Sequence, residues 1–135
     1  MPTFNDPAAD ATEAQQALRG LAHATRSIDD PGQIYSVLGS LSAAAASLGQ
    51  SLHQLAAFHD GPAQMRARVT GNDRSGRAAP HQVSWELHRA GEILRQVAAS
   101  LDHAHEVEAS ITYDQRDIPL VPQPPRSTPN QGLSL

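Results

Sequence analysis

The fold is decided by residues 31–59, which read PGQIYSVLGSLSAAAASLGQSLHQLAAFH and contain no Asp, Glu, Lys or Arg. Apolar side chains recur through this stretch in alternating steps of four and three residues, at Ile34, Leu38, Leu41, Ala45, Leu48, Leu52, Leu55 and His59. Such a heptad pattern keeps one side of an α-helix against a neighbouring helix over about four heptads. Because the remaining positions also lack charge, we expect this helix to be covered on more than one side.

Local signals mark both ends of this helix. Asp30 is a typical N-cap, Pro31 suits the first helical position, and Gln33 stands at the reciprocal position of a capping box. At the other end, Gly61 supplies a left-handed residue and Pro62 cannot continue the helix. The sequence therefore predicts a helix over residues 31–60.

Two further helices are predicted on either side. Residues 81–110 repeat the heptad spacing at Val83, Leu87, Ala90, Leu94, Val97, Leu101, Ala104 and Glu108. Residues 11–27 form a shorter amphipathic segment with Asp10 as its N-cap. We expect an all-α fold over residues 10–112, an antiparallel three-helix bundle dominated by a long helical hairpin, with a flexible Arg-rich loop over 62–80.

The two ends of the chain are expected to lie outside the bundle. Residues 1–9 are predicted to be disordered, and residues 113–135 form a Pro-rich tail that we expect to be extended or disordered. The start of the chain lacks the basic and apolar regions of a signal peptide. No stretch reaches the roughly 20 apolar residues of a membrane span. We therefore expect a cytoplasmic protein without a membrane partner.

Composition excludes several kinds of chemistry. The 135 residues contain neither cysteine nor lysine and carry a formal net charge of −4, which rules out thiolate metal sites, cysteine nucleophiles and a P-loop. No complete catalytic constellation is visible, so we expect a protein that is not an enzyme and uses no cofactor. The seven histidines include His88, four residues before Glu92, but lack the paired ligand motifs of a helical metal site. We therefore assign none of these residues as a metal ligand. A metal-binding bundle ranks third among our hypotheses, after the two given below.

Contacts with partners are the function that the pattern favours. Trp85 falls on the outward side of the 81–110 helix, where it is either covered by the loop or tail or marks a partner surface. The uncharged outer side of the 31–60 helix predicts a homodimer or docking of another helical protein. Its candidate contact residues are Gly39, Ala43, Ala46 and Gln50.

The loop and the tail carry two further motifs. Four arginines of the loop, which we interpret as a solvated segment, are the candidate phosphate contacts of a nucleic-acid partner: Arg66, Arg68, Arg74 and Arg77. Tyr113 and Asp117 fit the Tyr-x-x-x-Asp/Glu signal of type VII secretion substrates, and their position after a long helix is similar. Those proteins share a Trp-x-Gly turn, whereas Trp85 here is followed by Glu86 and Leu87.

Three segments resemble small uncharacterised actinobacterial helical proteins that are found among mobile-element and conjugation-type genes. The segments are IYSVLG at 34–39, QLAAFH at 54–59 and WELHRA at 85–90. The resemblance spans about residues 10–115 and implies an accessory role in DNA transfer or mobile-element maintenance, with no functional residue attached. We therefore expect a non-enzymatic, self-associating interaction or structural protein, and the alternative is a type VII secretion-like helical hairpin.

Overall fold

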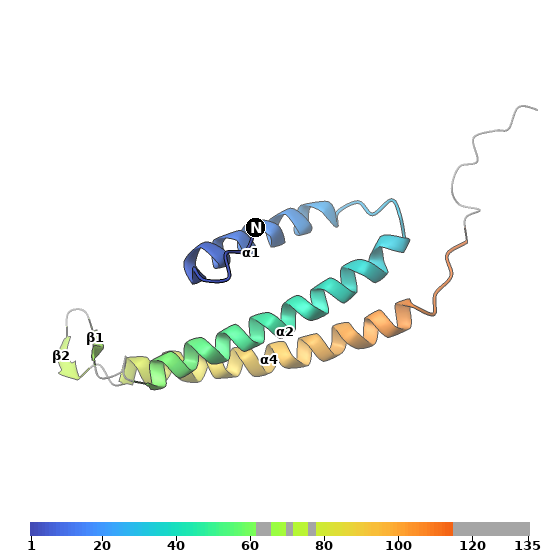
Figure 1. Cartoon of the computed structure of the whole chain (residues 1–135). Coiled ribbons are helices and arrows are strands. Elements are labelled where there is room, and N and C mark those ends of the chain that lie inside the picture. The colour runs from blue at the N-terminus through green and yellow to red at the C-terminus, as the bar shows by residue number, and fades with distance from the viewer. Residues whose placement is uncertain (62–65, 70–71, 76–77, 115–135) are drawn as a thin grey trace, which may run out of the picture.

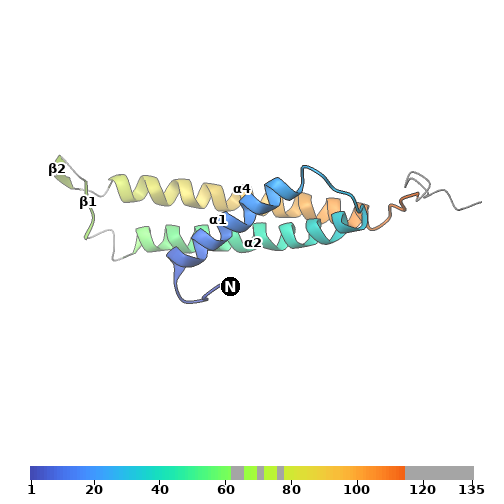
Figure 2. The same cartoon turned by 90° about the horizontal axis from the view of Figure 1, so that it is seen from above.

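Two long antiparallel helices form the body of the molecule (Figure 1). A computed structural model describes residues 1–61, 66–69, 72–75 and 78–114. Helix α2 covers Gly32–Asp60 and helix α4 covers Ala78–Glu108, and the two lie side by side along their length (Figures 1 and 2). The all-α class and the dominant helical hairpin predicted from the sequence are therefore confirmed.

The seam between α2 and α4 is built from small residues. The residues buried on the two helices are Ser42, Ala45, Gly49, Ala56, Pro80, Ser84, Gly91 and Ala98. A Cβ atom added at Gly49 would lie 3.4 Å from the carbonyl oxygen of Gly91, so the two backbones come close together at this point. Among the described residues, no large side chain is fully buried.

This seam corrects the register that we expected for α2. The leucine stripe was predicted to face the neighbouring helix, but Leu48 and Leu55 are 46% and 49% exposed. The next residues in the chain, Gly49 and Ala56, are buried instead. Because Ala45 belongs to both stripes and the other buried positions lie one residue further along, the seam is rotated by about 50° around the helix axis, half of the 100° between successive residues. Small side chains allow the helices to approach closely, and the leucines are left beside the seam.

The first helix, α1, covers Pro7–Ala24 and folds back over one broad side of the hairpin (Figures 1 and 2). It crosses the hairpin obliquely (Figure 2) and none of its residues is buried. Leu18, one of its apolar residues, is 50% exposed. Within the described residues, the three predicted helices are therefore present, and most of their packing lies between α2 and α4.

The start of the chain is more ordered than the sequence suggested. Helix α1 begins at Pro7, four residues before the predicted start, and its N-cap is Asp6, which accepts a hydrogen bond from the amide of Ala9 at 3.1 Å. Asp10, expected to be the cap, lies inside the helix and accepts hydrogen bonds from the amides of Thr3 and Phe4. The Thr3 amide lowers the pKa of Asp10 below its ordinary value. These hydrogen bonds hold Thr3 and Phe4 against the first turn of α1.

The ends of the hairpin differ slightly from the prediction. Helix α2 begins at Gly32, whose amide donates to Asp30 Oδ1 at 2.9 Å, and it ends before Gly61, which is extended (φ −93°) rather than left-handed. Helix α4 begins three residues before the predicted position 81 and ends two residues before 110. Part of the predicted loop forms a two-stranded antiparallel ribbon of β1, Arg68–Val69, and β2, Asn72–Ser75 (Figure 1).

Candidate functional site

Apolar residues of both long helices, most of them leucine or valine, gather on one side of the hairpin. Each of them immediately precedes a buried seam residue, and together we call them the apolar face: Leu41, Leu48 and Leu55 of α2, with Val83, Ala90 and Val97 of α4. In two antiparallel helices that face each other, a step back of one residue from the seam leads to the same broad side of the pair on both helices. The six residues therefore share one face.

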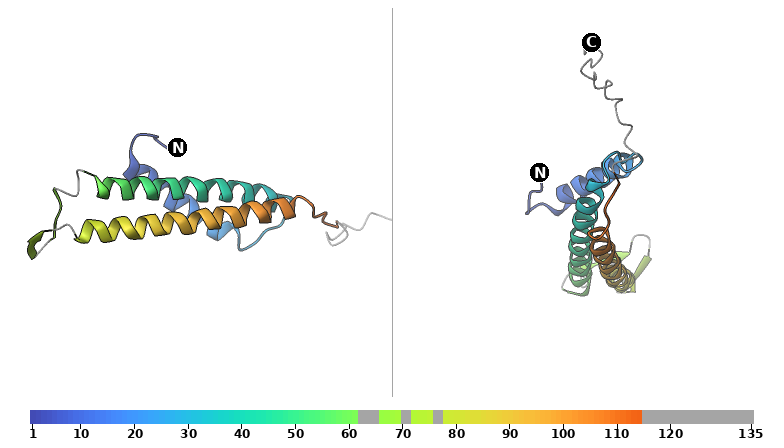
Figure 3. Two further views of the ribbon diagram at one scale, coloured as in Figure 1. Left: turned by 90° about the horizontal axis from the view of Figure 1, so that it is seen from below. Right: turned by 90° about the vertical axis from the view of Figure 1, so that its right-hand side faces the viewer.

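The apolar face is incompletely covered within the single chain. Leu48 and Leu55 are about half exposed, and Val83 and Val97 are each 41% exposed. The face carries no charged side chain. In a right-handed helix, the residue before a seam residue lies about 100° around the axis, and here that is the side on which α1 lies. The end view of Figure 3 shows α1 above the two long helices. Because α1 has no buried residue, it leaves the leucines and valines largely open.

Two histidines cross the seam, each over a glycine of the opposite helix. His53 of α2 lies over Gly91, where an added Cβ atom would stand 2.7 Å from His53 Nε2. Towards the other end, His105 of α4 lies over Gly39, where an added Cβ atom would stand 3.0 Å from His105 Nε2. The His105 ring also stacks on Tyr35, with ring centroids 4.0 Å apart. Each glycine thus provides the space for a partly buried imidazole.

The His53 end carries a row of four titratable side chains. His53 Nδ1 and His88 Nδ1 are 2.9 Å apart. The other ring nitrogens face carboxylates, with His88 Nε2 3.3 Å from Asp60 Oδ2 and His53 Nε2 3.7 Å from Glu92 Oε1. A hydrogen bond from the Ser84 side chain lowers the pKa of Asp60, and the contact with His88 lowers it further. This row alternates between the two helices and links them.

A buried serine makes a second polar contact across the seam. The Ser42 hydroxyl lies within hydrogen-bond distance of Asp102 Oδ1 and 3.3 Å from the carbonyl oxygen of Ala98. Ser42 is only 5% exposed, whereas Asp102 is exposed, so the bond joins a buried hydroxyl to a carboxylate at the edge of the seam. This contact fixes α2 against α4 at mid-length.

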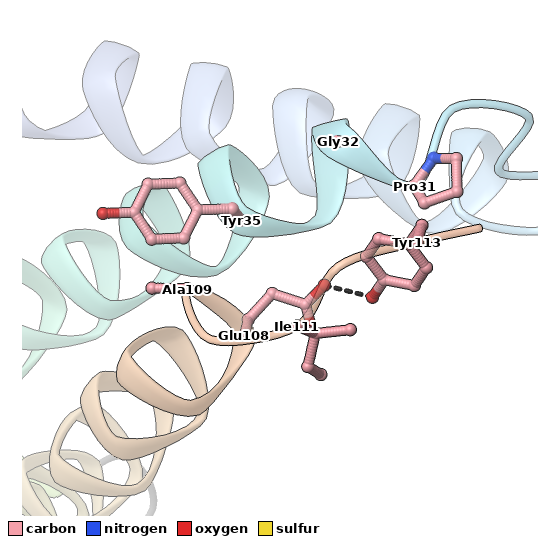
Figure 4. Close-up of a pocket in the computed structure, with 7 residues that line it drawn as sticks. All are labelled: Pro31, Gly32, Tyr35, Glu108, Ala109, Ile111 and Tyr113. Atoms are coloured by element: carbon pink, nitrogen blue, oxygen red, sulfur yellow. Dashed lines mark hydrogen bonds between the residues drawn. The ribbon is translucent and has the colours of Figure 1, made fainter. Parts of the chain in front are cut away.

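A shallow hollow lies where the chain leaves α4 (Figure 4). It has a volume of about 270 Å³ and is lined by Pro31, Gly32, Tyr35, Glu108, Ala109, Ile111 and Tyr113. The Tyr113 hydroxyl donates a hydrogen bond to Glu108 Oε1, as the dashed line in Figure 4 shows, and this bond raises the pKa of Tyr113. The contact turns the segment after α4 back towards the helix end.

The structure separates the predicted contact residues into groups. Gly39 belongs to the seam region, where His105 covers it, whereas Ala43, Ala46 and Gln50 are exposed on the side of α2 away from the apolar face. Trp85 is 60% exposed, with the Arg89 guanidinium carbon 5.5 Å from its ring centroid. Neither group is on the apolar face, and their roles as partner contacts remain predictions.

The predicted arginine and tail contacts are placed only in part. Arg66 is exposed, Arg68 lies in β1 and Arg74 in β2. Arg77 and Asp117 lie outside the described residues. In the ribbon, Arg68 of β1 pairs with Ser75, the neighbour of Arg74 in β2. A phosphate or signal site at these residues remains a prediction.

Sequence reasoning missed His53 and His105 as seam residues. The available signal was a histidine on one helix and a glycine on the other, at matching distances from the turn of the hairpin. Within the described residues, no group of three or more metal-ligating side chains converges. None of the described helices is long and apolar enough to span a membrane.

Comparisons with protein-family models, curated proteins and solved structures find no match for this chain. The features of the molecule that bear on its function are therefore the apolar face, the histidine row and the end of α4.

Proposed function

We propose that this chain is a non-enzymatic helical interaction protein that forms a homodimer through its apolar face. The observation that carries the proposal is the contrast within each long helix. The seam buries alanine, glycine and serine, while four of the leucines and valines beside it stay 41–49% exposed on one shared face: Leu48, Leu55, Val83 and Val97. Full burial of a leucine or valine side chain contributes about 1.5–3 kcal/mol, so covering this face is strongly favourable.

A second copy of the chain fits this face better than a charged partner does. The six residues of the face carry no charge, so two copies meet there without the like-charge repulsion expected from a net charge of −4. Both helices repeat their apolar residues in heptad steps, which suits packing of two hairpins at about 20° into a four-helix bundle. A two-fold dimer uses the same patch on both copies, and two helices alone form only one layer of a core.

The proposed accessory role in DNA transfer or mobile-element maintenance follows from the resemblance of segments 34–39, 54–59 and 85–90 to proteins of such gene clusters. A dimeric helical adaptor is a suitable scaffold for that role. The proposed dimerisation does not depend on which partner the protein brings to the DNA-transfer machinery.

The experiment compares two single charges added to opposite sides of α2. We expect Leu48→Glu to weaken dimerisation at least about tenfold, because it places a carboxylate in an apolar interface. Gln50→Glu adds the same charge on the far side of the helix and is expected to leave dimerisation unchanged. Sedimentation velocity of both variants, with circular dichroism as the check on folding, measures the effect. If the two variants dimerise equally, the apolar face is not the dimer interface.

Helix α1 is the competing occupant of the face within one chain. If α1 covers the face, the full-length protein is a monomer, and deletion of residues 1–27 both lowers its stability and creates self-association. The proposed homodimer instead forms with α1 present.

A type VII secretion-like hairpin is the second candidate function. It is supported by two long antiparallel helices followed, five residues after the end of α4 at Glu108, by a 41% exposed Tyr113. Under this proposal, Tyr113→Ala abolishes export of the chain from a type VII-competent host, while Tyr35→Ala does not. Unchanged export of Tyr113→Ala eliminates this candidate.

A further inference from the structure

Two imidazole nitrogens from different helices meet beside the seam. His53 Nδ1 of α2 and His88 Nδ1 of α4 are 2.9 Å apart. Without a metal ion, one neutral ring donates its N–H to the other, so a single proton satisfies the contact. A divalent metal ion can take the place of that proton, because a neutral imidazole binds metal through an unprotonated ring nitrogen.

The far side of the His88 ring suits this exchange. When Nδ1 binds a metal ion, the ring carries its proton on Nε2, and His88 Nε2 lies 3.3 Å from Asp60 Oδ2. Metal-ligating histidines usually donate their other N–H to a carboxylate, a carbonyl or water in this way. A hydrogen bond from Ser84 lowers the pKa of Asp60, so the acceptor stays ionised. Glu92 Oε1, 3.7 Å from His53 Nε2, is too far for a hydrogen bond and adds a nearby negative charge.

Both rings are positioned by the fold before any metal ion binds. The His53 ring lies over Gly91, where an added Cβ atom would stand 2.7 Å from His53 Nε2. Its place across the seam therefore depends on a residue without a side chain. The His88 ring is held from the opposite helix by Asp60. Ligands that are already in place lose less conformational freedom on binding.

The separation of the two nitrogens favours one coordination geometry. With metal–nitrogen bonds of about 2.0–2.1 Å, neighbouring ligands at 90° are about 2.8–3.0 Å apart, whereas tetrahedral ligands are about 3.3–3.4 Å apart. The observed 2.9 Å matches neighbouring positions of a square-planar or octahedral centre. Cu²⁺ and Ni²⁺ take such tetragonal geometry with nitrogen and oxygen ligands, and Zn²⁺ prefers the tetrahedron.

We propose that His53 and His88 form a two-histidine site for a tetragonal divalent ion, Cu²⁺ or Ni²⁺, which joins α2 to α4 in the half of the hairpin nearer the β1–β2 ribbon. Water supplies the remaining ligands. The two histidines are 35 positions apart in the chain, so the packed helices bring them together and the unfolded chain does not. The ion therefore binds the folded chain more tightly and stabilises it.

This inference does not rest on the proposed dimer. His53 is three residues after Gln50 and four before Ala57, so it shares their side of α2, away from the apolar face. A monomer holds both ligands. Because dimerisation is measured with a chelator present, failure of either proposal leaves the other standing.

Urea unfolding of the full chain, with and without a saturating concentration of Ni²⁺, tests the site near pH 7.5, where imidazoles are mostly neutral. We expect Ni²⁺ to lower the unfolding constant at least about fivefold. His53→Gln and His88→Gln should each remove most of this effect. The matched control, His103→Gln, changes an exposed histidine of α4 and should keep the effect in full. No stabilisation of the unchanged chain, or equal stabilisation of all variants, overturns the proposal.

Two further measurements test the geometry of the site. Gly91→Ala keeps both ligands but displaces the His53 ring, so it should reduce the stabilisation by Ni²⁺. Zn²⁺ at the same concentration should stabilise the chain less than Ni²⁺, and a larger effect of Zn²⁺ would contradict the tetragonal assignment. Sedimentation velocity at one chain concentration should show the same mass with and without Ni²⁺. An increase in mass that disappears in His88→Gln would place the two ligands on different copies and overturn the site within one chain.

Discussion

The seam and the apolar face are neighbouring stripes on the same two helices, but they differ in side-chain size and in burial. Ala56 in the seam is fully buried, whereas Leu55, the preceding residue, is 49% exposed on the face. Ala98 and Val97 on α4 show the same contrast, at 9% and 41%. The smaller residue is the more deeply buried one in each pair.

This difference indicates that the seam holds the two helices together, whereas the apolar face is available for association. Small residues let the backbones of α2 and α4 approach closely, with Gly49 opposite Gly91, and polar contacts such as that of Ser42 with Asp102 fix their alignment. The larger apolar residues contribute less within one chain because they are only half covered. Their burial energy is therefore available for association.

The largest expected effect on stability is at Ala56, the most deeply buried residue of the seam. Replacement of Ala56 by leucine adds three carbon atoms where no space exists, and overpacking of this kind costs about 1–3 kcal/mol. Ala57→Leu, at the exposed neighbouring position, is the matched control and is expected to change the free energy of unfolding by less than about 0.5 kcal/mol. Urea denaturation measures both variants, and equal effects would remove the distinction between seam and surface.

A smaller effect is expected where the seam is polar. Ser42→Ala removes the hydrogen bond to Asp102 and should lower the free energy of unfolding by about 1 kcal/mol. The loss is moderate because Asp102 is exposed and water can replace the serine. Ser47→Ala, on the exposed side of α2, serves as the control. A Ser42→Ala chain as stable as the original would show that close packing alone aligns the helices.

The smallest expected effect lies beyond the seam, at the end of α4. The hydrogen bond to the Glu108 carboxylate raises the pKa of Tyr113, so Glu108→Gln should return this pKa towards the ordinary value of about 10. The raised pKa means that the bond stabilises the folded end at neutral pH and is lost as pH rises through the titration of Tyr113. Ultraviolet titration in a Tyr35→Phe background isolates the signal. An unchanged titration would show that the contact contributes nothing in solution.

The sequence predicted the helices and the hairpin well, because the charge-free heptads and the Asp60-Gly61-Pro62 stop act locally. It did not predict the register of the seam. The leucine stripe and the observed seam both fit steps of four and three residues, and both include Ala45. Hydrophobicity favours the leucines, whereas close backbone approach favours Gly49 and Ala56, and only the packed pair of helices decides between them.

The candidate site was predicted only in its general character. A lack of charge on α2 indicated a surface for a partner, but Ala43, Ala46 and Gln50 lie on the opposite side from the exposed leucines. The contacts of His88 with Asp60 and His53 join residues 28 and 35 positions apart along the chain. Spacing within one helix cannot show such a contact, because it depends on the register between two helices.

Sedimentation velocity of the unchanged full-length chain, from about 1 to 100 µM, tests the central claim most directly, because standard-sized dimer interfaces commonly dissociate at or below micromolar concentrations. We predict a concentration-dependent conversion from a 14.4 kDa monomer to a species of twice that mass. A monomer throughout this range would contradict the account, because the apolar face would then remain open or be covered by α1 alone.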